Sequence, residues 1–350
     1  MRLRHLHPKW GPKTLYLELG HSDRLKSLKI PKPSTIAGFL KAQSLVKEYQ
    51  KHIPLANTEL HEVEQVHEQW QLDAKGASWI DNLGKVVFIN VKDVVSKVHC
   101  ASLPLLSLAH NGSASADDYR HALRLAFVEF GMPVKIQVDH AGVFFDNTHK
   151  SPFPTKFHLW LISLGIDLIF SRKAQPKDQA IVERSHQTIM HQLASQNPFN
   201  SLLQLAQKTN ERRHLLNYKL PCKSCQHQPP LVAYPQAKHS GRYYHPDLEE
   251  SLMNLNRVYQ YLEKGSWIRK VNKQKRVVIA GQYCSLRKAQ VGAKVKITCC
   301  AKHSVYRFED PHSGQSFDPK PIKNININEL QGTPFLNRRQ HGIQLSMPFC

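Results

Sequence analysis

Three acidic residues, Asp73, Asp139 and Glu183, stand where a folded chain could bring their carboxylates together. Asp73 and Asp139 each end a run that is predicted to be a β-strand, and Glu183 lies in the helical stretch 178–190, DQAIVERSHQTIM. Three carboxylates at one place repel each other unless a cation neutralises them. Magnesium suits such a site, because it prefers hard oxygen ligands and keeps coordination positions open for phosphate oxygens.

A site with these three carboxylates predicts a phosphoryl-transfer reaction that is assisted by two metal ions. Two Mg²⁺ ions roughly 3.5–4 Å apart stabilise both the entering and the leaving oxygen at phosphorus. We expect Asp73 to bridge the ions, with Asp139 on one and Glu183 on the other, and Mn²⁺ to be able to replace Mg²⁺. The attacking oxygen would come from water, for strand cleavage, or from a DNA 3′-hydroxyl, for strand joining.

Each acid also has an ordinary structural interpretation. Aspartate at a strand end is commonly a turn residue, and Glu183 could form a solvated ion pair with the adjacent Arg184. The chain has other isolated acids of this kind, among them Asp93, Asp146 and Asp167. The three candidates stand out only through the order of the strands, the place of Glu183 beside the apolar stripe of its helix, and their basic surroundings.

The elements that would position these acids follow the order β-β-β-α-β-α-β-α. Residues 68–76, 85–93 and 97–105 are predicted to form a meander of three strands. The next helix begins at a capping serine, Ser115, and ends at Gly131. A strand to Asp139, a helix, a short strand and a helix capped by Asp178 complete the pattern. Antiparallel strands followed by β-α-β crossovers predict a mixed sheet with helices on its faces, in which the first and fourth strands can be neighbours.

The segments on either side of this core have other patterns. Residues 12–20 and a second helix with Ser34 or Thr35 as its N-cap could form a DNA-reading helix-turn-helix or a plain helical hairpin. Residues 197–256 are rich in Pro, Gln and His and are expected to be loop-like. From Trp267 onwards, short alternating runs predict a small five-stranded barrel.

The charge of the chain is concentrated at its two ends. Of the formal net charge of +21, residues 1–60 carry +7, residues 257–350 carry +12, and the middle carries only +2. A basic surface that merely aids solubility would not predict this segregation. Two basic ends around a near-neutral centre indicate a polyanion, and nucleic acid is the expected partner.

The composition excludes several classes of protein. With 350 residues, 41% apolar and 9% aromatic, the chain can bury real cores and is not disordered throughout. No apolar run is long enough to span a membrane, and the N-terminus lacks the apolar stretch of a secretory signal. Seven scattered cysteines fit a reducing cytoplasm. Cys222 and Cys225 have metal-ligand spacing, but His227 is the single further candidate close by, so two loop thiols are favoured over a zinc site.

Three short motifs together resemble the acidic boxes of integrase-core transposases, the DDE recombinases with a ribonuclease H-like fold. They are WQLDAKG, VKIQVDHAGVFF and QPKDQAIVERSHQTI, which place Asp73, Asp139 and Glu183 on the three catalytic positions. Arg184 matches the basic residue that often follows the glutamate. The stretch VKDVVSK, with Asp93 and Ser96, matches a strand-turn signature of the family.

The resemblance extends over nearly the whole chain. HPKWGPKTLYLEL and PSTIAGFL look like the helix-turn-helix of bacterial insertion-sequence transposases, and GQYCSL with VGAKVKI looks like their C-terminal DNA-binding barrel. The sequence departs from the family in having DHAG where Asp-Asn-Gly is usual. It also has 43 residues between Asp139 and Glu183, which predicts an insertion near NTHKSPFP, residues 147–154. Many relatives carry a further N-terminal DNA-binding domain, whereas Met1 here opens almost on the helix-turn-helix.

The resemblance implies a transposase that cuts and joins DNA strands on Mg²⁺, as a homo-oligomer on DNA, in the bacterial cytoplasm at the nucleoid and away from membranes. The expected organisation is a helix-turn-helix segment at 1–60, a catalytic core at 61–200, a linker at 201–256, a barrel at 257–335 and a tail at 336–350. The basic side chains expected to contact DNA are Lys177, Arg184, Arg269, Lys270, Lys273, Lys275 and Arg276. Two alternatives remain open: a non-catalytic DNA-binding protein derived from a transposase, and a structure-selective nuclease on the same fold.

Overall fold

The computed structural model describes residues 1–6, 12–20, 22, 25, 28–46, 63–106, 113–172, 176–194 and 198–334. By its internal contacts the chain divides into two units, Met1–Leu55 and Ala56–Cys350, and each is described by itself. Within the described ranges no helix is long and apolar enough to cross a membrane.

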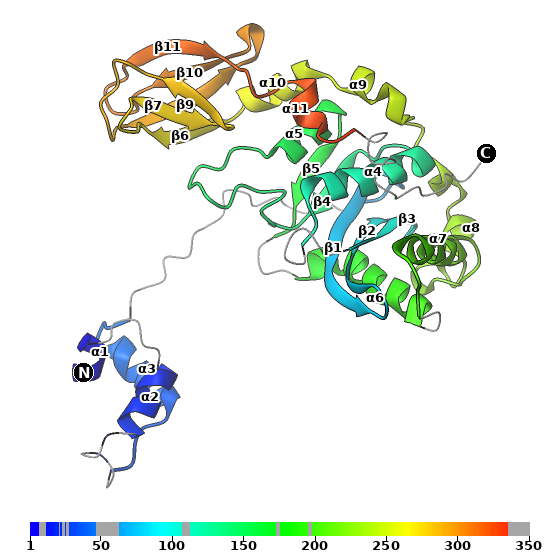
Figure 1. The fold of residues 1–350 in the computed structure, drawn as a ribbon, viewed down its shortest axis with the longest axis horizontal. Coiled ribbons are helices and arrows are strands. Elements are labelled where there is room, and N and C mark those ends of the chain that lie inside the picture. The colour runs from blue at the N-terminus through cyan, green and yellow to red at the C-terminus, as the bar shows by residue number, and fades with distance from the viewer. Residues whose placement is uncertain are drawn as a thin grey trace. The chain divides into compact units, whose positions relative to one another are not determined.

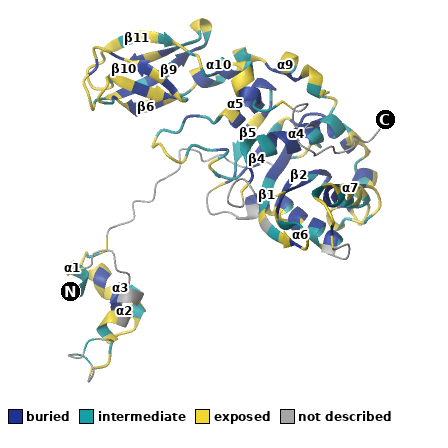
Figure 2. Ribbon diagram, in the orientation of Figure 1, coloured by how far each residue is buried: buried dark blue, intermediate teal, exposed yellow. Residues whose placement is uncertain are grey.

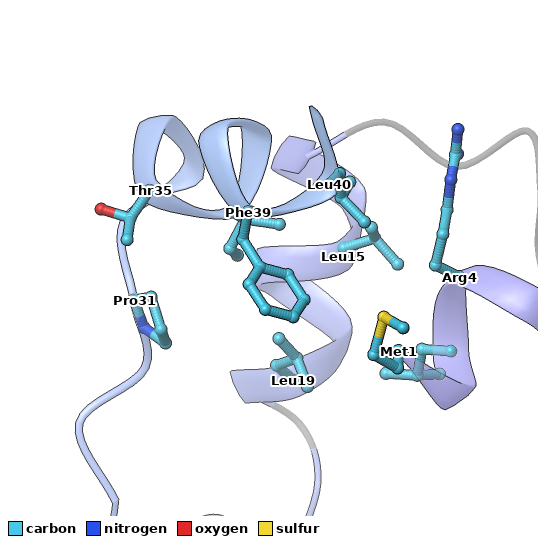
Figure 3. A pocket seen from close by; sticks show the side chains of 10 residues that line it. Met1, Arg4, Leu15, Leu19, Pro31, Thr35, Phe39 and Leu40 are labelled. Carbon is cyan, nitrogen blue, oxygen red and sulfur yellow. The ribbon is translucent and has the colours of Figure 1, made fainter. Parts of the chain in front are cut away.

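The N-terminal unit is a small group of helices: α1 (Arg2–Leu6), α2 (Pro12–Gly20) and α3 (Pro33–Ala42). Leu15 of α2 packs against Ile36 and Leu40 of α3 in a small buried cluster. Beside it an apolar pocket of about 320 Å³ remains open, and Phe39 points from α3 towards Leu19 (Figure 3).

The start of α3 differs from the expected one. The N-cap is Lys32, not Ser34 or Thr35, and Pro33 occupies the first turn. Proline fits the first helical position because its φ angle is already helical and the N–H that it lacks would be unpaired there. The two helices predicted from the sequence are therefore present, and the structure does not decide between a helix-turn-helix and a plain hairpin.

The second unit is built on a mixed five-stranded sheet with the order β3-β2-β1-β4-β5 (Figure 1). Its strands are β1 (Gln69–Ile80), β2 (Gly84–Asp93), β3 (His99–Leu106), β4 (Lys135–Val138) and β5 (Asp167–Phe170). The first three pair antiparallel as the predicted meander, while β1 with β4 and β4 with β5 pair parallel. The predicted neighbourhood of the first and fourth strands is thus confirmed.

Helices cover both faces of this sheet. On one face α4 (Ala116–Phe130) packs Phe127 against Trp70, and α5 (Lys156–Ser163) adds Trp160. On the other face α6 (Ala180–Ala194) packs Ile189 against Val86 and Phe88 of β2. The alternating side chains of β2 thus enter two separate cores, which Figure 2 shows as dark ribbon along the sheet. This is the mixed α/β core that the pattern of residues predicted.

The start of α4 follows its sequence signal closely. Ser115 is the N-cap, and its hydroxyl and the Asp118 carboxylate form a reciprocal capping box. Gly131 ends the helix at φ 73°, where a Cβ would approach the Ser240 hydroxyl and the Arg242 carbonyl oxygen. Glycine suits this end for both reasons.

Residues 197–256 are not loop-like, contrary to expectation. They contain the 17-residue helix α7 (Leu202–Tyr218), which begins at the capping side chain of Ser201. Further short helices follow at α8 (Pro230–Ala233) and α9 (Glu249–Leu252). The sequence signal of α7 is weak because it buries polar side chains such as Arg213 and Asn217, which bond to the backbone carbonyl of His99.

The C-terminal part consists of one helix followed by two sheets and a final short helix. Its elements are α10 (Leu255–Glu263), β6 (Ser266–Lys270), β7 (Arg276–Ile279), β8 (Gln282–Ser285), β9 (Lys294–Cys300), β10 (Val305–Glu309), β11 (Ser316–Pro321) and α11 (Ile327–Gln331). The strands form a four-stranded sheet, β11-β10-β9-β6, and the separate hairpin β7-β8. The all-β character is as predicted, but a closed five-stranded barrel is not seen.

The insertion expected near residues 147–154 contacts this C-terminal part. Trp267 donates its indole N–H to the Pro152 carbonyl oxygen at 3.0 Å, and Arg269 donates to the Ser151 carbonyl oxygen at 2.7 Å. The rings of Phe153 and Trp267 lie 4.6 Å apart. The long segment between β4 and α5 therefore joins the core to the C-terminal sheet.

Candidate active site

Asp73 lies on β1, and Asp139 directly follows β4, the strand that runs parallel to β1 in the sheet. Gln71 of β1 pairs with Gln137 of β4, and each acid follows one of these two glutamines by two residues. Asp73 does not end its strand as predicted, because β1 continues to Ile80 and pairs with β2 along its length. The pairing with β4 ends before Asp73, so Asp139 begins the loop beyond Val138.

The two carboxylates share an environment. Burial raises the pKa of the Tyr119 hydroxyl on α4. The nearby carboxylates of Asp73 and Asp139 raise this pKa further. Asp139 accepts a hydrogen bond from the Ala141 backbone N–H at 2.8 Å through Oδ1, so the turn in DHAG closes on this carboxylate. A cation can bind where two negatively charged groups lie close together, because it offsets their repulsion.

His186 connects Asp73 to helix α6. Its Nε2 lies 3.0 Å from Asp73 Oδ2, and its Nδ1 lies 2.6 Å from the Asn90 side-chain amide. Ser102 donates its hydroxyl to Asn90 Oδ1 at 2.5 Å. Asn90 is fully buried and His186 is 6% exposed, so this chain from β3 through β2 and α6 fixes one oxygen of Asp73.

Buried glutamines hold the beginning of α6 against the sheet. Gln71 accepts from the Val182 backbone N–H at 3.1 Å and donates to the Asp178 carbonyl oxygen at 2.6 Å. Gln69 and Gln71 both donate to Gln137 Oε1. Because these amides are shielded from water and bonded to one another, they determine where the first turn of α6 lies.

Asp178 does not cap α6 as predicted. The helix begins at Ala180, after a 3-10 turn at Pro176–Gln179. The Asp178 carboxylate instead accepts from the Arg172 backbone N–H at 2.9 Å and from its guanidinium at 2.8 Å. This pair lowers the pKa of Asp178.

Glu183 lies in the first turn of α6, three residues before His186, and is exposed. It is therefore on the helix that reaches Asp73. In the described part of the chain, however, no three His, Cys, Asp or Glu side chains are grouped so as to hold a metal ion. In the described part of the chain, the three predicted carboxylates therefore do not form one metal-binding group.

The donor chemistry of the pair suits a hard cation. His186 takes one oxygen of Asp73 and the Ala141 N–H takes one oxygen of Asp139. Among the described residues, no hydrogen bond donor reaches the other oxygen of either carboxylate. Free carboxylate oxygens on adjacent strands, with an exposed Glu on the nearest helix, are ligands that Mg²⁺ accepts.

Asp93, in the strand-turn signature, has a structural role. It is fully buried and accepts from the backbone N–H and hydroxyl of Ser96 at 2.7 and 2.6 Å, and from the His67 N–H at 2.8 Å. These bonds close the turn between β2 and β3. The ordinary interpretation of an isolated acid therefore holds for Asp93.

The predicted DNA-contacting side chains lie in different surroundings. Arg184 is exposed on α6, as are Lys270, Lys273, Lys275 and Arg276 at the β6–β7 end of the C-terminal part. Arg269 is only 7% exposed and donates to the carbonyl oxygens of Ser151 and Ile268. Its guanidinium group therefore stabilises the contact between the C-terminal sheet and the core. The side chain of Lys177 is outside the described residues.

His186 and Asn90 had no assigned role in the sequence prediction. Two signals were available: Asn90 interrupts the apolar run VVFINV, and His186 follows Glu183 at i+3, on the same side of α6. Neither signal names a partner, because the bond to Asp73 joins residues that are 113 positions apart.

One segment of the second unit matches a known protein family. Residues 164–230, which comprise β5, α6 and α7 and extend to the start of α8, match the family described as Integrase core domain. The resemblance seen in the sequence motifs is thereby confirmed for this segment, which includes Glu183 and Arg184.

The solved structures that the chain is similar to include those of retroviral integrases. The catalytic core of HTLV-2 integrase in complex with magnesium, in a trimeric form, is 15% identical, covering 48% of this chain and 96% of that chain with a TM-score of 0.37. The core of BIV integrase is 15% identical over 49% and 95%, with a TM-score of 0.35. The simian T-cell lymphotropic virus intasome with PP2A regulatory subunit B56 gamma is 13% identical over 89% and 97%, with a TM-score of 0.40.

Proposed function

We propose that the chain is a DNA transposase that cleaves DNA strands and joins them to a target in a metal-dependent reaction. The observation that carries this proposal is the bond of α6 to Asp73 through His186, with Asp139 directly after the strand that runs parallel to β1. The match of residues 164–230 to the integrase core supports it.

Asp73, Asp139 and Glu183 would hold Mg²⁺, or Mn²⁺ in its place. Bound there, the metal would stabilise charge on the entering and leaving oxygens of the phosphodiester. The chain's own residues orient this site: His186 fixes Asp73, the Ala141 N–H fixes Asp139, and Gln71 fixes the turn of α6 that carries Glu183. For Glu183 to bind the same ion as Asp73, its exposed side chain has to turn towards the sheet.

The partner would be double-stranded DNA, as element ends and as target. The N-terminal helices would read the ends of an insertion sequence, and the exposed Lys270, Lys273, Lys275 and Arg276 would bind phosphates through the C-terminal part. Arg184 and Lys177 would meet DNA near Glu183. Joining two DNA ends implies a homo-oligomer, and we place the protein at the bacterial nucleoid.

The test uses purified protein, linear DNA with the ends of the element that carries its gene, and a supercoiled target. Wild type is compared with Glu183→Gln, and with Glu250→Gln, an exposed acid on α9, as the matched control. Nicking and joining are expected in Mg²⁺ and Mn²⁺ and not in EDTA. Wild type and the control should behave alike, whereas Glu183→Gln should lose at least about a hundredfold in rate while binding DNA normally.

A second candidate is a non-catalytic DNA-binding protein, and one observation favours it: in the described part of the chain, no three His, Cys, Asp or Glu side chains are grouped so as to hold a metal ion. This candidate predicts tight binding of the element ends without chemistry in any metal. Cleavage without joining, and without preference for the ends, would instead indicate a structure-selective nuclease.

A further inference from the structure

A polar cavity lies beside the first turns of α6, and Lys92 and His99 of the sheet contribute to its lining. It has a volume of about 720 Å³ and opens between α6, the β2–β3 turn and the segment after α7. Its lining residues are Lys92, Lys97, His99, Ala180, Ile181, Arg184, Thr188, Leu216, Leu220, Pro221, Cys222, Lys223, Ser224 and Pro230. Four of them are Lys or Arg, and none is Asp or Glu.

Lys92 is the unusual member of this lining. It lies on β2 opposite Gln71 and is 8% exposed, yet its side-chain amine forms no hydrogen bond or ion pair with the residues that the structure describes. Burial lowers the pKa of its amine to about 8. A buried ammonium group without a partner is costly, and such groups are normally paired or bound to a ligand.

The groups that surround Lys92 do not neutralise it. His99 and Cys100 face it from β3, Lys97 from the turn, and the thiols of Cys222 and Cys225 from the segment after α7. The nearest carboxylate in the turn, Asp93, acts on Lys97 and is bonded to Ser96 and the His67 N–H. The unmet charge of Lys92 therefore faces the cavity.

Three further features of the cavity favour an anion. Arg184 and Lys223 are exposed at its rim. Ala180 and Ile181 belong to the first turn of α6, where the helix dipole places partial positive charge. Together with Lys92 at the buried end, they offer donors on several sides of one space.

We propose that this cavity binds a phosphate group through Lys92, Arg184 and the N-terminal turn of α6. At about 720 Å³ the space is larger than one phosphate, so the group can belong to a larger molecule. Two sources share this chemistry, a phosphate of the DNA backbone and a free phosphorylated compound. The site does not depend on catalysis by the three acids.

The test titrates pyrophosphate into the full chain at constant ionic strength and measures heat. Lys92→Met keeps the length of the side chain and removes its charge; a neutral apolar group is easier to bury, so the variant is expected to fold. Lys85→Met is the matched control, because Lys85 is exposed at the far end of the same strand. We expect wild type and Lys85→Met to bind alike and Lys92→Met to bind about tenfold or more weakly.

A second variant tests whether Lys92→Met weakens binding only by disturbing the fold. Lys223→Gln changes an exposed residue at the rim and should weaken pyrophosphate binding severalfold, with an unchanged melting temperature. If Lys92→Met and Lys223→Gln both bind pyrophosphate as tightly as wild type does, or if wild type does not bind it, the proposal is overturned.

The same titration, repeated with a short DNA duplex already bound, identifies the source of the phosphate. Displacement of pyrophosphate by DNA assigns the site to a backbone phosphate, and simultaneous binding of both assigns it to a small phosphorylated ligand. Failure of this site and failure of the transposase proposal remain separate, because Glu183→Gln should abolish strand transfer and leave pyrophosphate binding intact.

Discussion

At the scale of single residues, His186 shows how one side chain can connect a helix to a catalytic strand. Its two ring nitrogens face Asp73 and Asn90, and both partners lie on the sheet. The imidazole thus holds one oxygen of Asp73 in place and satisfies the amide of Asn90, which is fully buried. Preorganisation of a metal-ligating carboxylate by an outer partner is a common way to tune such a site.

Replacing His186 should therefore cost stability as well as order at Asp73. We expect His186→Ala to reduce the free energy of unfolding by about 1–3 kcal/mol, because it leaves the side-chain NH₂ of Asn90 without its acceptor in the interior. His186→Gln, whose amide can reach Asp73, should recover part of this loss. Urea unfolding measures both.

The control for this prediction is His191→Ala on the exposed side of the same helix. It should change the free energy of unfolding by no more than about 0.5 kcal/mol. Equal losses for His186→Ala and His191→Ala would show that the bonds to Asp73 and Asn90 contribute nothing specific.

At the scale of elements, the buried glutamines determine how α6 approaches the sheet. Gln71 pairs with backbone groups on both sides of the helix start, the Val182 N–H and the Asp178 carbonyl oxygen. The N–H groups of a helix's first turn have no partner within the helix, so a side chain from the sheet can fix its position. Glu183, one residue after Val182, is carried along with that turn.

Gln71→Leu should loosen the first turn of α6 without unfolding the sheet. The leucine is of similar size, but it leaves the Val182 N–H without its acceptor, at an expected cost of about 1–3 kcal/mol. Hydrogen exchange at Val182 should become faster, because local opening then costs less than global unfolding. Gln187→Leu, at an exposed position of α6, is the control and should leave this exchange unchanged.

At the scale of the whole second unit, a buried ion pair joins the core to the chain that follows it. Arg124 of α4 and Glu249 of α9 are each 1% exposed and lie 2.9 Å apart. Glu249 also accepts from the Trp160 indole at 2.7 Å and the Tyr244 hydroxyl at 3.1 Å. Arg124 donates further to the carbonyl oxygens of Gln331 and Thr333, so α4, α5, α9 and the end of α11 meet at this pair.

Replacing one partner of this ion pair should reduce the stability of the fold far more than replacing both partners with apolar residues. We expect Glu249→Ala to cost about 3–5 kcal/mol in unfolding free energy, because it leaves Arg124 charged and unpaired in the interior. The double variant Arg124→Met/Glu249→Leu should regain most of that loss. Urea unfolding measures the stability of the single and double variants. A double variant that is less stable than Glu249→Ala would contradict this prediction.

Much of the core could be predicted from local patterns. The meander, the capped helix α4, and the neighbourhood of β1 and β4 all follow from the period of apolar residues and from turn and cap chemistry. The helix α7 could not be predicted in this way. It buries Arg213 and Asn217 against the His99 carbonyl oxygen, and no local rule reveals a polar residue whose partner lies 114 or 118 positions away.

The candidate site likewise has features that the sequence predicts and features that only the folded structure reveals. Residue type and strand order were enough to name Asp73 and Asp139 as candidates, because neighbouring parallel strands end at the same edge of a sheet. The role of Asp93 as a turn residue and the hydrogen bond of Asp73 to His186 emerge from packing across the sheet. Alternation and charge are properties of neighbours along the chain, whereas hydrogen bonds and burial depend on residues that meet only after the chain has folded.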